Sequence, residues 1–322
     1  MIPLRLVQWF TMPADPAVFS GTPGVTGLAA HPKGGLLACA MDRRLVLCDL
    51  SAKPVEQKPL GPVAAAKHHA WAHENWLHDV AVHGERVATA GYDRLVRLWK
   101  WGESKADADL AGHGDWVRVV LFSPDGKTLA SAGDDGTARL WDAATGKPLA
   151  VLEAGDRYLD ALAWSPDGRT LLAAGHDGIL RFWDAAGRRL IRSVDIGNRR
   201  DIEDEPLNGG FSYPGGARGL AVSPDGKTVA VAGLYSLVLL GVDGKKAGEV
   251  AGRAFGCAFS PDGKRLLFSQ EKDLVVLDAA TRKETHRMKG DQLGLFAMLW
   301  LDGKRVAAGG CNGRVGIWEI PA

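Results

Sequence analysis

A four-residue turn, Ser-Pro-Asp-Gly, recurs along this chain and restricts its fold more than any other feature. It begins at four positions, Ser123, Ser165, Ser223 and Ser260. Proline suits the second position of a type I turn, and glycine suits the left-handed residue that follows. Apolar residues alternate before the turn, as in Val117, Val119 and Leu121, which is typical of short half-buried strands joined by hairpins. Because three such strands cannot bury both faces alone, the sequence predicts an array of repeated units.

The repeat is also marked by tryptophan. Trp99, Trp141 and Trp183 recur at intervals of 42 residues. Counting onward and back gives four weaker anchors, Cys48, Gly241, Leu277 and Trp318. Seven copies follow, and no low-complexity linker separates them. We therefore expect one domain over residues 1–322.

The third copy opens with Gly112-His113 and ends with Trp141-Asp142. This pattern resembles the WD40 (WD-repeat) family, whose repeats of roughly 40–45 residues carry these two signatures. The resemblance extends over nearly the whole chain and is partial in the first, fifth and sixth copies. It implies an all-β fold, a single seven-bladed β-propeller of four-stranded antiparallel blades. In that family each repeat is shared between two blades, so we expect an N-terminal strand at residues 4–10 to complete the last blade.

The resemblance also implies a buried, hydrogen-bonded set of His, Ser or Thr, Asp and Trp in each blade. The second repeat supplies His73, Thr89, Asp93 and Trp99, and the third supplies His113, Ser131, Asp135 and Trp141. The other repeats depart from the set, with Gly155 and Ala173 in the fourth, Tyr235 and Gly241 in the fifth, and Glu271 and Leu277 in the sixth. We expect the fifth and sixth blades to pack with more apolar side chains.

Two connections are longer than the repeat requires, at residues 61–75 and 197–216. In the family such connections lie on the top face, together with the turns that contain the blade aspartates. Long loops on one rim are frequent binding elements, although neutral drift of surface loops is the alternative reading.

Nine residues of the second to fourth repeats are not required by the fold and should point toward the top entrance of the central channel. They are Trp76, His78, Tyr92, Trp116, Arg118, Asp134, Tyr158, Asp160 and His176. Aromatic residues with interspersed charges are typical of a protein-recognition surface. The competing interpretation is that Trp76 and Trp116 plug the channel and pack on neighbouring blades.

Catalytic motifs are absent from the sequence, so we expect neither an enzyme nor a cofactor site. The alternative function is a small-ligand or metal site in the His-rich loop at residues 68–78, using His68, His69 and His78. A metal site there would need three or four convergent ligands, and His73 already has a structural role.

The amino-acid composition limits the classes of partner that this chain is expected to bind. The net charge of +1 argues against nucleic acid, and the basic residues Arg199, Arg200 and Arg218 lie close to several acidic ones. No apolar stretch is long enough to span a membrane, and the four cysteines lack metal-type spacing. We expect a cytoplasmic monomer that binds a protein or peptide, whose identity the sequence leaves open, on its top face and channel mouth.

Overall fold

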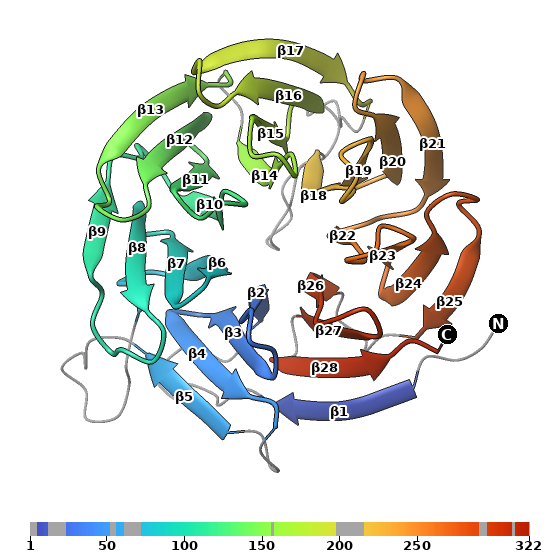
Figure 1. Ribbon diagram of the computed structural model, residues 1–322, viewed down its shortest axis with the longest axis horizontal. Helices are drawn as coiled ribbons and strands as arrows, with labels where there is room; N and C mark the ends of the chain where they lie inside the picture. The colour runs from blue at the N-terminus through green and yellow to red at the C-terminus, as the bar shows by residue number, and fades with distance from the viewer. Residues whose placement is uncertain are drawn as a thin grey trace, which may run out of the picture.

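The computed structural model describes residues 24–51, 72–155, 158–197, 216–289, 297–310 and 313–321 in full. It also gives the backbone at 5–11, 56–60 and 295–296. The described residues form 28 strands in seven four-stranded antiparallel sheets and contain no helix. The sheets are arranged as the blades of a ring, so the expected seven-bladed β-propeller is confirmed (Figure 1).

The first four blades follow one another along the chain. The first contains β2 (Val25–Ala30), β3 (Leu36–Met41), β4 (Arg44–Asp49) and β5 (Glu56–Leu60). The second contains β6 (Leu77–His83), β7 (Arg86–Gly91), β8 (Leu95–Lys100) and β9 (Ala108–Ala111). The third contains β10 (Val117–Phe122), β11 (Thr128–Gly133), β12 (Thr137–Asp142) and β13 (Pro148–Glu153). The fourth contains β14 (Leu159–Trp164), β15 (Thr170–Gly175), β16 (Ile179–Asp184) and β17 (Arg189–Asp195).

The remaining blades complete the circle. The fifth contains β18 (Ala217–Val222), β19 (Thr228–Gly233), β20 (Ser236–Gly241) and β21 (Lys246–Ala251). The sixth contains β22 (Cys257–Phe259), β23 (Arg265–Gln270), β24 (Asp273–Asp278) and β25 (Glu284–Met288). The seventh contains β26 (Leu295–Trp300), β27 (Arg305–Gly310), β28 (Arg314–Glu319) and, antiparallel to β28, β1 (Arg5–Thr11).

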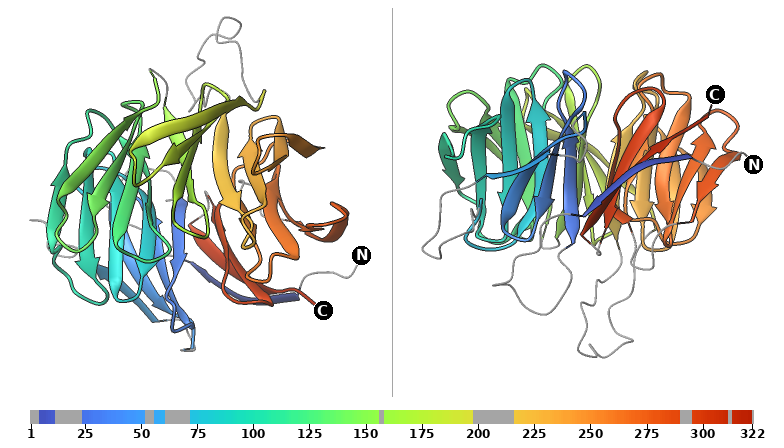
Figure 2. Two further views of the ribbon diagram at one scale, coloured as in Figure 1. Left: turned by 45° about the horizontal axis from the view of Figure 1, so that its top comes forward. Right: turned by 90° about the horizontal axis from the view of Figure 1, so that it is seen from below.

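Contacts between inner strands hold the ring together. Each inner strand packs against the inner strands of its two neighbours, and β26 contacts β2, so the circle is closed. The edge-on view in Figure 2 shows the blades standing side by side around the channel. Clusters of fully buried aliphatic and aromatic residues fill the spaces between consecutive blades. A closed ring of this kind leaves only short outer edges unpaired.

The fifth blade corrects one sequence assignment. Leu240, and not Gly241, occupies the position of the repeat tryptophan, because Leu240 pairs with Val229 as Trp141 pairs with Leu129. The turn that joins β19 to β20 is one residue shorter than the turn that joins β11 to β12, which displaced the count by one. Leu240 is 2 % exposed and belongs to an apolar cluster with Val231, as expected for this blade.

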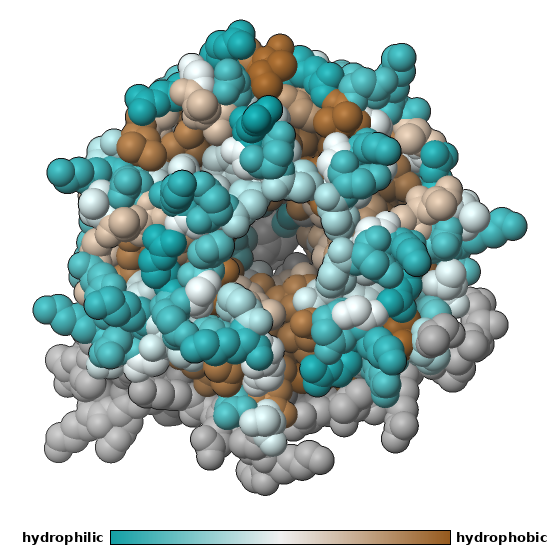
Figure 3. All heavy atoms as spheres, in the orientation of Figure 1, coloured by the Kyte–Doolittle hydropathy of each residue, from teal (hydrophilic) through white to brown (hydrophobic). Residues whose placement is uncertain are grey.

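A β-bulge near the start of the inner strand sets the lining of the central channel. Among the described residues, six inner strands shift register around their second residue, as between Val117 and Val119. A bulge frees one residue from the regular alternation of the strand. Five of these freed residues line a cavity of about 260 Å³ in the channel, namely Thr26, His78, Arg118, Asp160 and Arg218. Figure 3 shows the central hollow from one face, with hydrophilic and hydrophobic residues around its rim.

Candidate functional site

Two hydrogen-bonded tetrads fix the blades that carry the candidate site. In blade three, His113 Nδ1 lies 2.9 Å from Asp135 Oδ2, and its Nε2 lies 2.7 Å from Ser131 Oγ. The indole N–H of Trp141 donates to the same hydroxyl at 2.9 Å. In blade two the equivalent distances, between His73 and Asp93, His73 and Thr89, and Trp99 and Thr89, are 2.8, 2.8 and 2.9 Å. Every member of these sets therefore has a partner despite burial.

The tetrad aspartates also hold the segments that lead into the inner strands. Asp93 accepts the backbone N–H of Glu74 at 3.1 Å, and Asp135 accepts that of Gly114 at 2.9 Å. Burial acts to raise the pKa of Asp93, but hydrogen bonds and charges from His73 and Arg97 outweigh it and hold the value at about 2. An ionised carboxylate accepts such bonds strongly, so both segments are fixed in place.

Each of these segments ends in an exposed aromatic residue whose own backbone is pinned. The N–H of Trp76 donates to Asn75 Oδ1 and that of Trp116 donates to Asp115 Oδ1, both at 2.8 Å. The carbonyl of Trp116 in turn accepts the N–H of Asp134 at 2.9 Å. Gly133 is required for this approach, because a Cβ there would lie 2.0 Å from that carbonyl oxygen.

The same backbone pairing occurs in the two flanking blades. The N–H of Tyr92 donates to the carbonyl of Trp76 at 2.8 Å, and the N–H of His176 donates to that of Tyr158 at 3.0 Å. These pairs belong to the end of the ring that carries the turns at 92–94, 134–136 and 176–178, which we call the top face. Equivalent positions of three consecutive blades thus present their side chains on one rim.

Three rings on this rim are stacked in parallel. Tyr92 is stacked with both tryptophans, with its ring centroid 4.2 Å from that of Trp116 and 6.4 Å from that of Trp76. The interplanar angles are 6° and 17°. We call Trp76, Tyr92 and Trp116 the aromatic shelf. Both tryptophans are 41 % exposed, and Trp116 packs on Tyr92 of the neighbouring blade.

Arg118 lies beneath the shelf and is locked by carboxylates. Its Nη2 donates to Asp134 Oδ2 at 2.7 Å, while its Nε also bonds Asp134. The guanidinium carbon lies 5.4 Å from the ring centroid of Tyr92 and 5.8 Å from those of Trp116 and Tyr158. Burial would lower the pKa of Arg118, but Asp134 and Asp160 raise it above the ordinary arginine value. This paired cation therefore supports the rings as a fixed part of the site.

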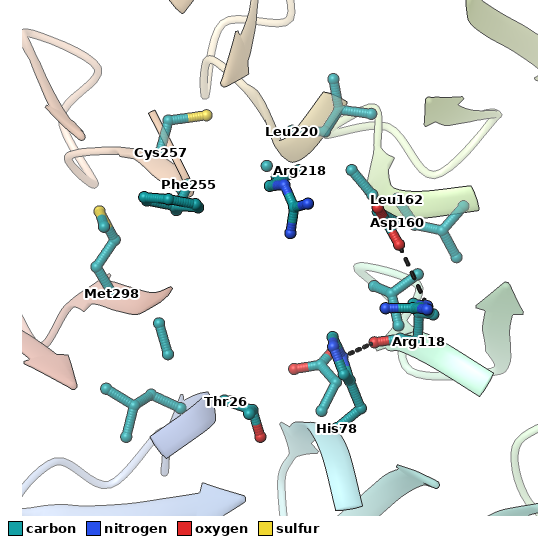
Figure 4. A pocket seen from close by; sticks show the side chains of 18 residues that line it. Thr26, His78, Arg118, Asp160, Leu162, Arg218, Leu220, Phe255, Cys257 and Met298 are labelled. Atoms are coloured by element: carbon teal, nitrogen blue, oxygen red, sulfur yellow. Dashed lines mark hydrogen bonds and ion pairs between the residues drawn. The ribbon is translucent and has the colours of Figure 1, made fainter. Parts of the chain in front are cut away.

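The channel wall continues this network across blades two to four (Figure 4). His78 Nδ1 donates to the carbonyl of Arg118 at 2.6 Å, and His176 Nε2 lies 2.6 Å from Asp160 Oδ2. Burial, followed by the charge of Arg118, lowers the pKa of His78 to about 4, so this ring is neutral at pH 7. Burial would raise the pKa of Asp160, but His176 and the nearby arginines hold it at about 2. The structure thus brings all nine predicted residues into one cluster.

Two further residues line the channel that sequence analysis did not place there. Arg218 on β18 and Phe255, just before β22, line the same cavity, with the guanidinium carbon 5.8 Å from the ring centroid (Figure 4). A simple signal would have found them, because Arg118, Asp160, Arg218 and Phe255 each stand five residues before the serine of a Ser-Pro-Asp-Gly turn.

The His-rich alternative receives no support from the described residues. His68, His69 and the larger part of loop 61–75 lie outside them, as do Arg199, Arg200 and almost all of loop 197–216. The described part of the chain contains no group of three or more His, Cys, Asp or Glu side chains able to hold a metal ion. Within that part, no helix is long and apolar enough to cross a membrane.

Comparison with known proteins agrees with this architecture. The family model described as "WD domain, G-beta repeat" matches residues 67–100, 105–142 and 146–184, the segments that contain the nine candidate residues. Three repeats of this chain thus match the WD40-repeat family, and the seven-bladed propeller supports that assignment. Members of this family are generally non-catalytic scaffolds that bind proteins or peptides.

The chain is also similar to individual proteins over short stretches of 45 or 46 residues. The chain is 44% identical over 46 residues to protein transport protein SEC13 of Eremothecium gossypii, which covers 13% of this chain and 16% of that protein. It is 40% identical over 45 residues to nuclear distribution protein PAC1 of Mycosarcoma maydis, and 42% identical over 45 residues to that of Coprinopsis cinerea. Each PAC1 match covers 14% of this chain and 10% of the relative.

Proposed function

We propose that this WD40 protein is a non-catalytic scaffold that binds a protein or peptide on its top face, at the channel mouth formed by blades two to four. The observation that carries the proposal is the aromatic shelf, in which two tryptophans stay 41 % exposed while they stack on Tyr92. Large exposed aromatic side chains beside arginine are the residues most enriched in protein-binding hot spots.

The rigidity of the shelf supports the same function. Its rings are fixed by backbone hydrogen bonds and by the ion pair between Arg118 and Asp134. A side chain that is already ordered loses little entropy when a partner covers it, and a preorganised surface binds more tightly for the same contact area.

The proposal includes a cytoplasmic monomer, and the free thiols of Cys39, Cys48 and Cys257 fit a reducing compartment.

The test is affinity capture from a lysate of the source organism with the wild type and with Trp76→Ala plus Trp116→Ala. We expect the double variant to lose a partner that the wild type captures, because its contact surface is removed. The melting temperature should change little, since both side chains are exposed. The matched control is Leu190→Ala plus Ile191→Ala, which removes two equally exposed apolar side chains from outer strand β17.

Two outcomes would contradict the proposal. Equal capture by the wild type and the tryptophan variant would show that the shelf is not the binding surface. A large fall in melting temperature for the tryptophan variant alone would show that the shelf is a structural element of the ring.

A further inference from the structure

We infer that the segment bound by the aromatic shelf is basic and places a lysine or arginine side chain against the exposed tryptophan faces. This inference rests on the proposed function and names the chemical class of the partner. It follows from three features of the top face: the position of two exposed carboxylates, the pairing of the buried cations, and the faces of the rings.

The two exposed carboxylates flank the shelf. Glu74 stands two residues before Trp76, and Asp115 stands directly before Trp116, and both are exposed. The position of Asp115 is fixed because its Oδ1 accepts the N–H of Trp116 at 2.8 Å. The backbone of Glu74 is fixed by its bond to Asp93. A cation that rests on the ring of Trp116 therefore meets a fixed carboxylate, and Glu74 adds a second exposed carboxylate two residues from Trp76.

Two arginines of blades two and three, Arg97 and Arg118, are paired with carboxylates. Arg97 Nη1 lies 2.7 Å from Asp93 Oδ2, and Arg97 Nε lies 3.0 Å from Asp109 Oδ1. Arg118 bonds Asp134, and its Nε lies 3.5 Å from Asp160 Oδ1. Two acidic groups thus face the single charge of Arg118.

The exposed charge of the same turns is acidic in balance. On the described turns of blades two and three, Arg94 is the exposed basic residue, against Glu74 and Asp115. An acidic segment would be repelled by this surface. Single-stranded nucleic acid stacks its bases on aromatic platforms but also needs an unpaired cationic groove to hold its phosphates. A basic peptide meets neither obstacle.

The ring faces suit the same partner. The face of an aromatic ring carries negative charge density, and tryptophan attracts ammonium and guanidinium groups most strongly. The long methylene stems of lysine and arginine can cover apolar ring surface while their charged ends remain near water. Both tryptophans of the shelf are 41 % exposed, so each leaves part of its ring surface accessible to such a side chain.

The test uses fluorescence anisotropy with three labelled peptides of equal length on the same Gly-Ala framework, carrying Lys and Arg, Glu, or no charge, and a labelled oligothymidylate. We expect the basic peptide to bind most tightly and to weaken as salt is added. Trp76→Leu plus Trp116→Leu should weaken it roughly tenfold, through loss of two exposed cation–π contacts.

Charge variants isolate the acidic contribution. Glu74→Gln plus Asp115→Asn should weaken binding of the basic peptide about fivefold and leave the neutral peptide unchanged. Asn75 already occupies the position of Asp115 in blade two, so Asp115→Asn preserves the local hydrogen bond. The matched control, Glu103→Gln plus Asp107→Asn, removes two exposed charges from the connection between β8 and β9 and should have no effect.

The outcomes separate this inference from the proposed function. If the tryptophan variant loses its captured partner but the basic peptide binds no better than the other probes, the inference is wrong and the proposed function stands. Preference for the oligothymidylate or the acidic peptide, or basic-peptide binding that does not depend on Trp76 and Trp116, would also overturn it. If neither partner capture nor peptide binding depends on the shelf, the proposed function and this inference are both wrong.

Discussion

Blades three and six fill the same position of the fold in opposite ways. In blade three a small polar residue on the second strand, Ser131, lies under a large aromatic residue on the third, Trp141. In blade six the positions that correspond are Phe268 on β23 and Leu277 on β24. Phe268 is 1 % exposed and Leu277 is 3 %, and both belong to one apolar cluster. The aromatic ring has moved from one strand to its neighbour.

This difference shows that the tetrad is one of several ways to complete a blade. A blade core needs a large and a smaller side chain that together fill the space between two strands, at the packing density of a protein interior. A hydroxyl under an indole satisfies this need and also requires hydrogen bonds, whereas an apolar pair requires none. Weak repeats in the sequence can therefore form regular blades.

The largest effect should come from breaking the apolar pair in blade six. Phe268→Ser should lower the free energy of unfolding by about 3–5 kcal/mol, because it opens a cavity in a fully buried position. Adding Leu277→Trp should restore part of the loss, because the new indole fills the space and can donate to the new hydroxyl. Denaturant unfolding of both single variants and the double variant gives the coupling, which should favour the double variant by roughly 1–3 kcal/mol. If the two substitutions lower the free energy of unfolding additively, a large and a small side chain cannot be exchanged between these two strands, and this account is wrong.

An intermediate effect is expected from removing the hydroxyl in blade three. Ser131→Ala leaves His113 Nε2 and the indole N–H of Trp141 without their partner, which should cost roughly 2 kcal/mol. The matched variant is Ser131→Thr, which keeps the hydroxyl and copies Thr89 of blade two. Thermal and denaturant unfolding should place the threonine variant close to the wild type. Equal stability of the alanine variant would mean that blade three, like blade six, holds by apolar packing alone.

The smallest effect concerns acid, which should weaken a tetrad blade and spare an apolar one. The pKa of Asp93 is about 2 in the folded protein and about 4 when unfolded, so its stabilising contribution is complete above about pH 4 and is lost as the pH falls toward 2. The stability gap between the wild type and Asp93→Asn should therefore shrink across this window in denaturant unfolding. Asp107→Asn, on an exposed connection, is the control and should follow the wild-type profile. A gap that stays constant down to pH 2 would contradict this account.

The sequence predicted most of the ring because its signals are local. The Ser-Pro-Asp-Gly turns and the tryptophan spacing reported the strand order, and the spacing from His113 to Asp135 pointed to residues that are hydrogen-bonded in the structure. The misplaced Gly241 shows the limit of counting, because one shortened turn shifts the positions that follow it within the same repeat.

The sequence predicted which residues form the candidate site but not how their side chains are arranged. Repeat equivalence identified Trp76, Trp116 and Arg118, since each stands at a fixed offset from a repeat marker. The stacking of Tyr92 with two tryptophans depends on how adjacent blades curve toward each other, which no local pattern encodes. Phe255 was missed because the sixth repeat lacks the histidine from which the offset was counted.

The bulges near the start of the inner strands separate what the ring needs from what it can display. In a strand without a bulge, side chains alternate strictly between the two faces of the sheet. The face that each residue occupies is therefore set by the neighbours that must point into the core. The bulge removes this constraint, so Thr26, His78, Arg118, Asp160 and Arg218 can differ widely in size and charge while the flanking core residues keep their places. Each of these five blades thus offers the channel one position that the blade core does not constrain. An engineer could rewrite this ring of side chains one blade at a time and obtain new specificities from an unchanged frame.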